Sequence, residues 1–206
     1  MRRLIVGMTG ATGAQIGIRL LEELREQPEV ETHLVMSRWA RATIELETNR
    51  TAREVARLAD ITHGPDDQAA SISSGSFRAD GMVIVPCSAK TLAAVRSGYG
   101  SDLIARAADV TLKEQRRLVM VVRETPLSTI HLENMLELSR MGVTMLPPMP
   151  AFYNRPASVD DIVDHIVVRV MDQFGLDSER AVRWNGPATA RRGRREDVAV
   201  RSVSNG

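Results

Sequence analysis

The sequence predicts a single α/β domain in which a parallel sheet carries helices on both faces. Short apolar runs alternate along the chain with amphipathic helical stretches, which is the pattern of a parallel sheet with crossover helices. The runs are continuously apolar, as in strands that are buried on both faces. The chain has 206 residues, of which 43% are hydrophobic and 26% charged, and this suits one folded domain with its own core.

The expected strands are five apolar runs that end in turns or polar loops. They cover residues 4–6, 32–36, 81–85, 118–122 and 143–146. After Gly13, the helical spacing of Ile16, Leu20, Leu21 and Leu24 predicts the first helix. A later helix is expected to begin at the N-cap Ser128, to carry Leu132, Met135 and Leu136, and to stop at Gly142.

The last helix has the clearest ends. Ser158 is its expected N-cap, Asp160 and Asp161 lie in its first turn, where the helix dipole favours them, and Gly175 ends it. Its expected apolar face comprises Val159, Ile162, Val163, Ile166, Val167, Val170 and Phe174, and Arg169 borders that face.

Charge is uneven along the chain, although the formal net charge is only +1. Residues 186–206 hold five arginines, and without that segment the body has 22 basic and 24 acidic residues. The tail has no hydrophobic periodicity and is predicted to be disordered. It also lacks aromatic residues for base stacking, so nucleic-acid binding is not indicated.

The cellular compartment of the protein can be predicted from its single cysteine and from the lack of long apolar runs. Cys87 cannot form an intrachain disulfide, which fits a reducing compartment. The apolar run after the first two arginines is too short for a signal peptide, and no run approaches the ~18 residues of a membrane span. We expect a soluble cytoplasmic protein that does not bind membranes.

A glycine-rich turn follows the first expected strand. Gly7, Gly10 and Gly13 are spaced Gly-x-x-Gly-x-x-Gly, whereas the dinucleotide fingerprint is Gly-x-Gly-x-x-Gly. The second strand ends at Ser37 instead of an acidic residue for a ribose diol. A phosphate at the helix N-terminus is therefore expected to belong to a mononucleotide. A tight turn without a ligand is the alternative.

Three further segments that follow later strands contain candidate ligand-binding residues. Ligands of open α/β sheets bind at the carboxyl ends of strands, where residues 86–91 (PCSAKT) and 123–126 (RETP) lie. Ser88 is equally explained as a helix N-cap, and Arg123 with Glu124 as a surface ion pair. The proline-rich segment 147–156 holds Tyr153 at its tip, either for a phosphate or as a rigid connector. The four histidines are scattered and match no metal-site spacing, so no metal is expected.

From about residue 2 to Trp184, the chain resembles flavin prenyltransferases of the UbiX type. The resemblance is carried in order by GMTGATGAQIGIRLL, ETHLVMS, SISSGSF, VIVPCSAKTL, RAADVTLKEQRRLVMVVRETPLS, HLENMLELSRMG and PPMPAFYNRP. It implies a three-layer αβα, Rossmann-like (flavodoxin-like) fold. Residues 1–185 would form the flavoprotein domain, and residues 186–206 the Arg-rich tail.

The resemblance also implies the reaction. Such enzymes transfer a dimethylallyl group from dimethylallyl phosphate, or from the pyrophosphate in some members, to N5 and C6 of reduced FMN. They need no metal. The product, prenylated FMN, serves a UbiD-type decarboxylase. The family forms homo-oligomers, often dodecamers, with sites between subunits.

Matching positions give the expected site residues. Those at FMN are Gly10, Ala11, Thr12, Ser37, Ser88, Ala89, Lys90, Thr91 and Arg123. Those at dimethylallyl phosphate are Arg106, Lys113, Tyr153 and Arg169. The expected catalytic residues are Glu124, Glu47, Lys113 and Trp184. Either Glu124 or the departing phosphate would be the base for the C6 proton, and the Trp184 indole would face an allylic cation.

Two other functions compete with this interpretation. The related flavin-dependent cysteine decarboxylases typically carry a Pro-Ala-Ser-Ala-Asn-Thr segment, whereas this chain has PCSAKT. A non-catalytic FMN carrier, or an accessory subunit of an aromatic-acid decarboxylase, would need only the FMN residues. The presence of Lys113, Tyr153 and Arg169 together favours a second phosphate site.

Overall fold

The computed structural model describes residues 1–184, so the Arg-rich tail from residue 186 lies outside the described residues. The strands are β1 (Arg2–Met8), β2 (Val30–Met36), β3 (Ile61–His63), β4 (Gly81–Cys87), β5 (Arg117–Val122) and β6 (Thr144–Met145). The helices are α1 (Ala14–Arg25), α2 (Arg38–Glu47), α3 (Ala52–Ala56), α4 (Ala89–Ser97), α5 (Leu103–Lys113), α6 (Thr129–Arg140) and α7 (Val159–Gln173), with a 3₁₀ turn at Ser71–Ser73.

The six strands form one parallel sheet in the order β3-β2-β1-β4-β5-β6. If the three-residue edge strand β3 is left aside, the five others run in the flavodoxin-like order. The chain reverses its direction of winding between β1 and β4, and ligands of such sheets bind at that switch point. The predicted three-layer fold is therefore confirmed, and its topology marks where a site should lie.

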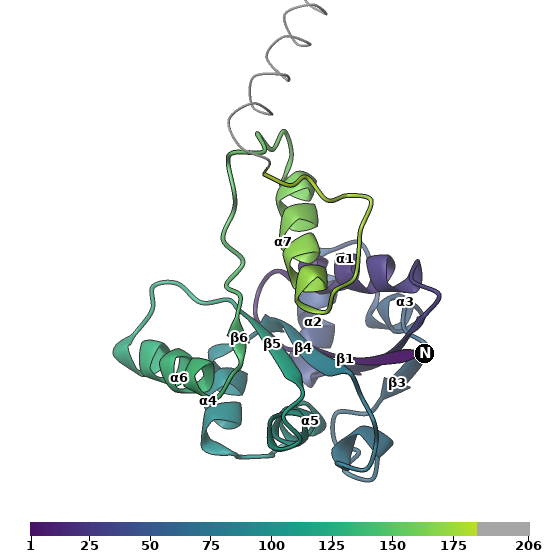
Figure 1. The fold of residues 1–206 in the computed structure, drawn as a ribbon, viewed down its shortest axis with the longest axis vertical. Coiled ribbons are helices and arrows are strands. Elements are labelled where there is room, and N and C mark those ends of the chain that lie inside the picture. The colour runs from purple at the N-terminus through teal and green to yellow at the C-terminus, as the bar shows by residue number, and fades with distance from the viewer. Residues whose placement is uncertain (185–206) are drawn as a thin grey trace, which may run out of the picture.

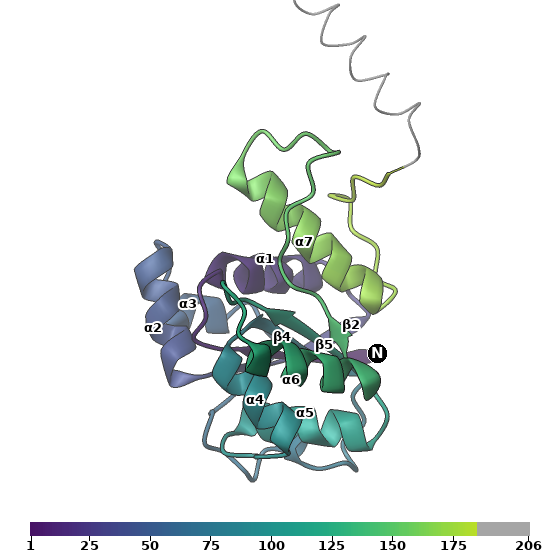
Figure 2. The same cartoon turned by 90° about the vertical axis from the view of Figure 1, so that its left-hand side faces the viewer.

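Helices cover both faces of this sheet (Figures 1 and 2). One hydrophobic cluster joins α1, α2, α3 and α7 to one face, through side chains such as Leu4, Val83 and Val167. The other joins α4, α5 and α6 to the opposite face, through side chains such as Ile84, Leu103 and Leu138. Strand residues alternate between the two clusters, which explains why the strands read as continuously apolar.

Some local expectations differ from the structure. The strand expected at 143–146 contains only Thr144 and Met145, because Pro147 and Pro148 follow and cannot donate ladder hydrogen bonds. The side chain of Val159 is 64% exposed and lies outside the core face of α7. Leu132 and Leu136 of α6 are each 50% exposed, so the apolar side chains of this helix are only partly covered by their own chain.

Candidate functional site

The carboxyl ends of four strands are joined by backbone hydrogen bonds. The amide of Ser37, after β2, donates to Met8 O of β1 over 3.0 Å. The amide of Arg123, after β5, donates to Cys87 O of β4 over 3.0 Å. We call the residues at these ends the strand-end site; it comprises Gly10–Thr12, Ser37, Ser88–Thr91 and Arg123. All the residues expected at FMN therefore lie at one edge of the sheet, around its switch point.

Thr9 connects the two central segments of this site and was missed by the sequence analysis. Its hydroxyl donates to Pro86 O over 2.8 Å and accepts the Ser88 amide over 2.8 Å. The Thr9 side chain is buried, so these bonds are shielded from water. The signal that could have identified it is a threonine at the end of a buried strand, where a hydroxyl has backbone groups to satisfy.

Gly10 and Gly13 are required for different reasons. A Cβ on Gly10 would lie 2.3 Å from the Cβ of Trp39 in α2, so the loop approaches this helix too closely for any side chain. Gly13 has φ 99° and forms the N-cap of α1, and this left-handed conformation favours glycine. The two glycines thus shape the turn between β1 and α1.

Glu47 occupies the N-terminus of α1. Its Oε2 accepts the amides of Gly13 over 2.8 Å and of Ala14 over 2.9 Å, and its negative charge complements the helix dipole. The expectation of a mononucleotide phosphate on these helix amides therefore needs correction, because a carboxylate already satisfies them. Glu47 comes from the end of α2, so the contact also fixes α2 against the glycine-rich turn.

Two serines of the strand-end site are helix N-caps. Ser37 Oγ accepts the Ala40 amide over 3.1 Å at the start of α2, and Ser88 Oγ accepts the Thr91 amide over 3.3 Å at the start of α4. The alternative interpretation of Ser88 as a cap is confirmed. Capping leaves the Ser88 hydroxyl proton able to donate, and Thr91 Oγ1 lies 3.1 Å away as one partner.

Arg123 and Glu124 do not form the surface ion pair that the sequence left open. Glu124 Oε1 accepts the amide of Thr125 over 3.1 Å. Within residues 1–184, Arg123 and Lys90 are in no ion pair shorter than 4 Å. The strand-end site therefore holds two cations that are not neutralised by a carboxylate of the described chain, as suits an anionic ligand.

Arg106 and Lys113 lie on α5, on the face of the sheet opposite α7. Arg106 Nε donates to Ser73 O over 3.1 Å, and its Nη1 pairs with Asp109 at 2.8 Å. Lys113 pairs with Glu114, close to Gly75. Both cations therefore border the serine-rich loop 71–76, and within residues 1–184 neither side chain is hydrogen-bonded to the strand-end site.

Tyr153, Arg169 and Trp184 form a third group, beside α7. Residues 147–157, which we call the arm, extend from β6 to α7 without regular structure (Figure 1). The rings of Tyr153 and Trp184 are 5.5 Å apart at 70°, and both are about half exposed. Arg169 pairs with Asp172 at 2.7 Å. The expected donor-site residues thus fall into two groups on opposite faces of the sheet.

The histidines are better placed than their scatter in the sequence suggested. His33 Nδ1 and His63 Nε2 are 3.0 Å apart, and their rings stack. His131 completes the capping box of α6 with Ser128, and His165 contacts the ring of Tyr153. No set of three or more His, Cys, Asp or Glu side chains in residues 1–184 is arranged to hold a metal ion.

Cys87 is not suited to be a nucleophile. Its side chain is fully buried, and burial raises the pKa of the thiol well above its usual range. The lone cysteine is a small residue of the core. Among the helices of the described part of the chain, none combines the length and the apolar composition needed to cross a bilayer.

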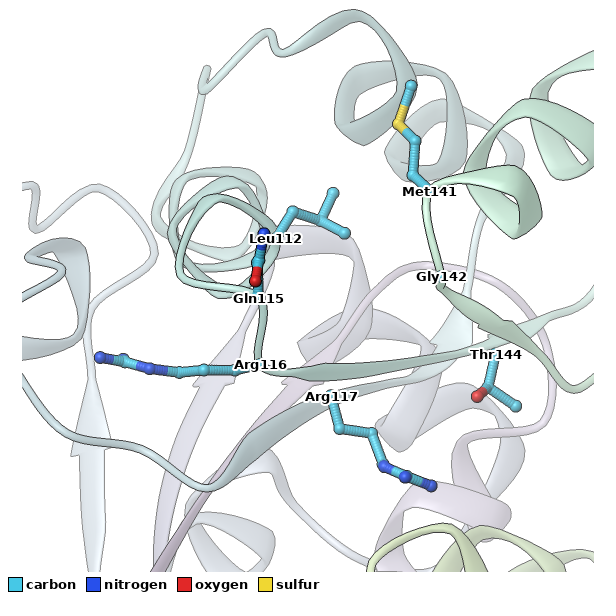
Figure 3. Close-up of a pocket in the computed structure, with 7 residues that line it drawn as sticks. All are labelled: Leu112, Gln115, Arg116, Arg117, Met141, Gly142 and Thr144. Carbon is cyan, nitrogen blue, oxygen red and sulfur yellow. The ribbon is translucent and has the colours of Figure 1, made fainter.

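A cavity of about 490 Å³ lies at the opposite end of the sheet from the strand-end site (Figure 3). It is lined by Leu112, Gln115, Arg116, Arg117, Met141, Gly142 and Thr144, from the starts of β5 and β6 and the helices before them. None of the expected site residues lines it. The Arg116 and Arg117 side chains point in different directions, and Arg116 is engaged by Phe77 O and Gly75 O.

Comparison with known proteins identifies the family. The Flavoprotein family model matches residues 1–171. A probable UbiX-like flavin prenyltransferase of Streptomyces sp. (strain D7) is 69% identical over 189 residues, which are 92% of this chain and 94% of the relative.

Two solved structures share the fold throughout. A dodecameric FMN-dependent UbiX-like decarboxylase from Escherichia coli O157:H7 is 69% identical, with a TM-score of 0.89, and the match covers 89% of this chain and 100% of that one. AnUbiX in complex with FMN and dimethylallyl pyrophosphate is 58% identical, with a TM-score of 0.88 and coverage of 90% and 98%. This chain belongs to the UbiX-like flavin prenyltransferases of the flavoprotein family.

Proposed function

We propose that this protein transfers the dimethylallyl group of dimethylallyl phosphate to N5 and C6 of reduced FMN, and so makes prenylated FMN for a UbiD-type decarboxylase. The observation that carries the proposal is the strand-end site at the switch point of a sheet whose chain is 69% identical to a UbiX-like flavin prenyltransferase. Reduced FMN supplies the nucleophilic N5 and C6 atoms when bound.

The donor set of the strand-end site fits FMN. Backbone amides of Gly10, Ala11 and Thr12 and the hydroxyls of Ser37, Ser88 and Thr91 are small hydrogen-bonding groups that suit a phosphate, a ribityl chain or a ring edge. Ala89 would contribute its backbone only. Lys90 and Arg123 would balance the phosphate charge. Because Glu47 holds the α1 amides, the phosphate of FMN would bind the other groups of this site.

The donor phosphate would be bound by Arg106, Lys113, Tyr153 and Arg169. Negative charge grows on the leaving phosphate while an allylic cation forms. Three cations and a phenol in a site that excludes water would stabilise that charge. The Trp184 indole would stabilise the cation, and Glu47 would lie near the isoprenyl group. Glu124 or the departing phosphate would take the proton from C6.

A complete site requires more than one copy of the chain. Arg106 and Lys113 lie on the face of the sheet opposite Arg169 and Tyr153, so one chain does not surround one phosphate with all four. The partly uncovered apolar side chains Ile130, Leu132, Leu136 and Phe152 suit contacts between copies. We therefore propose a homo-oligomer with shared sites, a dodecamer as in the E. coli structure. Its expected compartment is the cytoplasm.

An anaerobic assay tests the proposal. The purified protein is mixed with reduced FMN and dimethylallyl phosphate, and the extracted flavin is weighed by mass spectrometry. A gain of one C5H8 unit is expected. Unchanged FMN that stays bound, with the pyrophosphate donor as well, would contradict the transferase and favour the non-catalytic FMN carrier.

A further inference from the structure

Three segments that are far apart in the sequence meet through aromatic rings beside α7. The ring of Tyr153, from the arm, is 5.8 Å from the ring of His165 on α7, at an interplanar angle of 84°. The ring of Tyr153 also contacts the ring of Trp184, in the C-terminal segment, with 5.5 Å between the ring centroids. Edge-to-face pairs of this kind fix ring orientation as well as distance. We call Tyr153, His165 and Trp184 the ring cluster.

Tyr153 lies in a turn of the arm that is closed by a hydrogen bond from the Arg155 amide to Phe152 O over 3.1 Å, but this turn contains two unfavourable features. Arg155 has φ 51°, a left-handed value that is unfavourable for a residue with a side chain. The Oδ1 atom of Asn154 is buried and has no hydrogen-bond partner among residues 1–184. Both features cost free energy, so contacts outside the arm must stabilise this conformation.

The C-terminal segment is fastened to the body just before Trp184. Arg180 pairs with Glu23 of α1 at 2.6 Å and with Asp164 of α7 at 3.2 Å. Arg183 pairs with Asp172 of α7 at 2.8 Å. These ion pairs hold the residues that precede Trp184 against α1 and α7. The indole of Trp184 takes no part in them and contacts the ring of Tyr153.

Asp161 of α7 accepts the amide of Ala157 in the arm over 2.7 Å, and one helical turn later His165 is the α7 ring that contacts the arm. It lines a cavity of about 200 Å³ between the arm and the C-terminal segment, together with Asn154, Arg155 and Arg180. Burial, with a smaller effect of Arg169, lowers the pKa of His165, so its ring is neutral at neutral pH and can pack without a charge to solvate. Arg169 follows one helical turn later, on the same face of α7.

We propose that His165 is a positioning residue. Its ring fixes the orientation of Tyr153 and, through Tyr153, that of the Trp184 indole, so that both lie in a fixed position relative to Arg169. The inference rests on the proposed function, which assigns Tyr153, Arg169 and Trp184 to the donor. His165 needs no contact with the donor or with FMN. Its role is to hold an otherwise strained arm in the one arrangement that lets the phenol and the guanidinium bind the same phosphate.

The kinetic test compares His165→Ala with His165→Phe. Loss of the ring in His165→Ala is expected to raise KM for dimethylallyl phosphate about three- to tenfold, the size of one lost edge-to-face contact. The Kd of FMN should stay unchanged. His165→Phe keeps a ring at this position and should restore KM. Ile162→Ala, which trims a partly buried side chain of α7, controls for general loosening of the helix and should lower the Tm without raising KM.

A second readout does not depend on turnover. In a Trp39→Phe background, Trp184 is the only tryptophan of the chain, and its emission should shift to the red in His165→Ala but not in His165→Phe or Ile162→Ala. The oligomeric mass of each variant is checked by light scattering.

The outcomes separate the two proposals. An active wild type with unchanged KM and unchanged Trp184 emission in His165→Ala overturns the positioning role. Failure of His165→Phe to restore either quantity also overturns the role of the ring. A wild type that makes no prenylated FMN with either donor overturns the proposed function, and the Trp184 emission of the variants then decides the ring contact alone.

Discussion

At the scale of single residues, Thr9 is the link between the two segments that flank the switch point. Its hydroxyl both donates to Pro86 O and accepts the Ser88 amide. Thr9→Val keeps the shape but removes both bonds, which leaves the Ser88 amide without its acceptor. We expect the free energy of unfolding to fall by about 1–3 kcal/mol and FMN to bind more weakly. Urea unfolding and an FMN titration measure the two effects.

Two control variants show whether the hydroxyl at this position is responsible. Thr9→Ser keeps the hydroxyl and should behave almost as the wild type does. Thr111→Val removes another buried hydroxyl, which donates within α5 to Ala107 O, and should leave FMN affinity unchanged. Equal FMN affinity in Thr9→Val and in the wild type would contradict the linking role of Thr9.

Gly10 is the other residue on which the strand-end site depends. An added Cβ would lie 2.3 Å from Trp39 Cβ, which is part of the α2 backbone framework and cannot rotate away. In Gly10→Ala, either the turn or α2 must therefore shift, at a cost of about 1–3 kcal/mol. We expect a lower Tm and a raised Kd for FMN, measured by quenching of flavin fluorescence.

Gly64→Ala is the matched control, since its Cβ would meet nothing closer than 3.8 Å. It should change neither the Tm nor the Kd of FMN by a comparable amount. If Gly10→Ala bound FMN as tightly as Gly64→Ala does, the close approach of α2 would not shape the site.

At the scale of elements, α7 carries a pH-sensitive cap. Asp161 accepts the amides of Ala157 and Ser158, and these bonds lower the pKa of its carboxyl group. The unfolded chain therefore binds this proton more readily than the folded one. The stability that Asp161 provides is complete above its unfolded pKa, near 4, and is lost as the pH falls through the lower folded value.

Asp161→Asn should consequently have a smaller free energy of unfolding than the wild type at pH 7, and this difference should shrink as the pH falls below the unfolded pKa and through the lower folded value. Urea unfolding at a series of pH values, with the protomer concentration held constant, measures this difference. Asp160→Asn removes the neighbouring first-turn charge and leaves the cap bonds in place. A gap between Asp161→Asn and the wild type that stays constant with pH would contradict the assignment.

At the scale of the whole molecule, the residues expected at the donor phosphate are divided between the two faces of the sheet. If Lys113 and Arg169 of different copies meet at one donor phosphate, Lys113→Ala and Arg169→Ala should each be inactive as pure oligomers. Oligomers that contain both variants should recover part of the activity, since some sites then receive the intact residue from each chain. The mass gain of extracted FMN, measured on co-expressed and co-purified variants, checks this.

Pure variants mixed after purification, without exchange of subunits, are the control and should stay inactive. Mixed oligomers that are verified by their two affinity tags and still make no prenylated FMN would place both residues of a site on one chain.

Much of the fold and of the strand-end site was predictable because the signals are local. Continuous apolar runs predicted five strands, and Ser88, Ser128 and Ser158 predicted helix starts that the structure confirms. Strand β3 was missed because three residues at a sheet edge carry no periodicity. The residues expected at FMN all follow strands directly, so the parallel sheet brings them to one edge.

The sequence by itself determined the layers of the fold, the ends of its best helices and, through its resemblance to a family, the reaction, and the same resemblance predicts which residues form the site. Only the tertiary structure decided that Glu47 accepts the amides of Gly13 and Ala14 at the start of α1, that Lys113 and Arg169 lie on opposite faces, and that the ring of Tyr153 contacts both His165 and Trp184. The physical reason is the distance along the sequence over which each interaction acts. Caps and apolar periodicity act within a few residues, whereas these contacts depend on the path by which crossovers and the arm return the chain to the sheet.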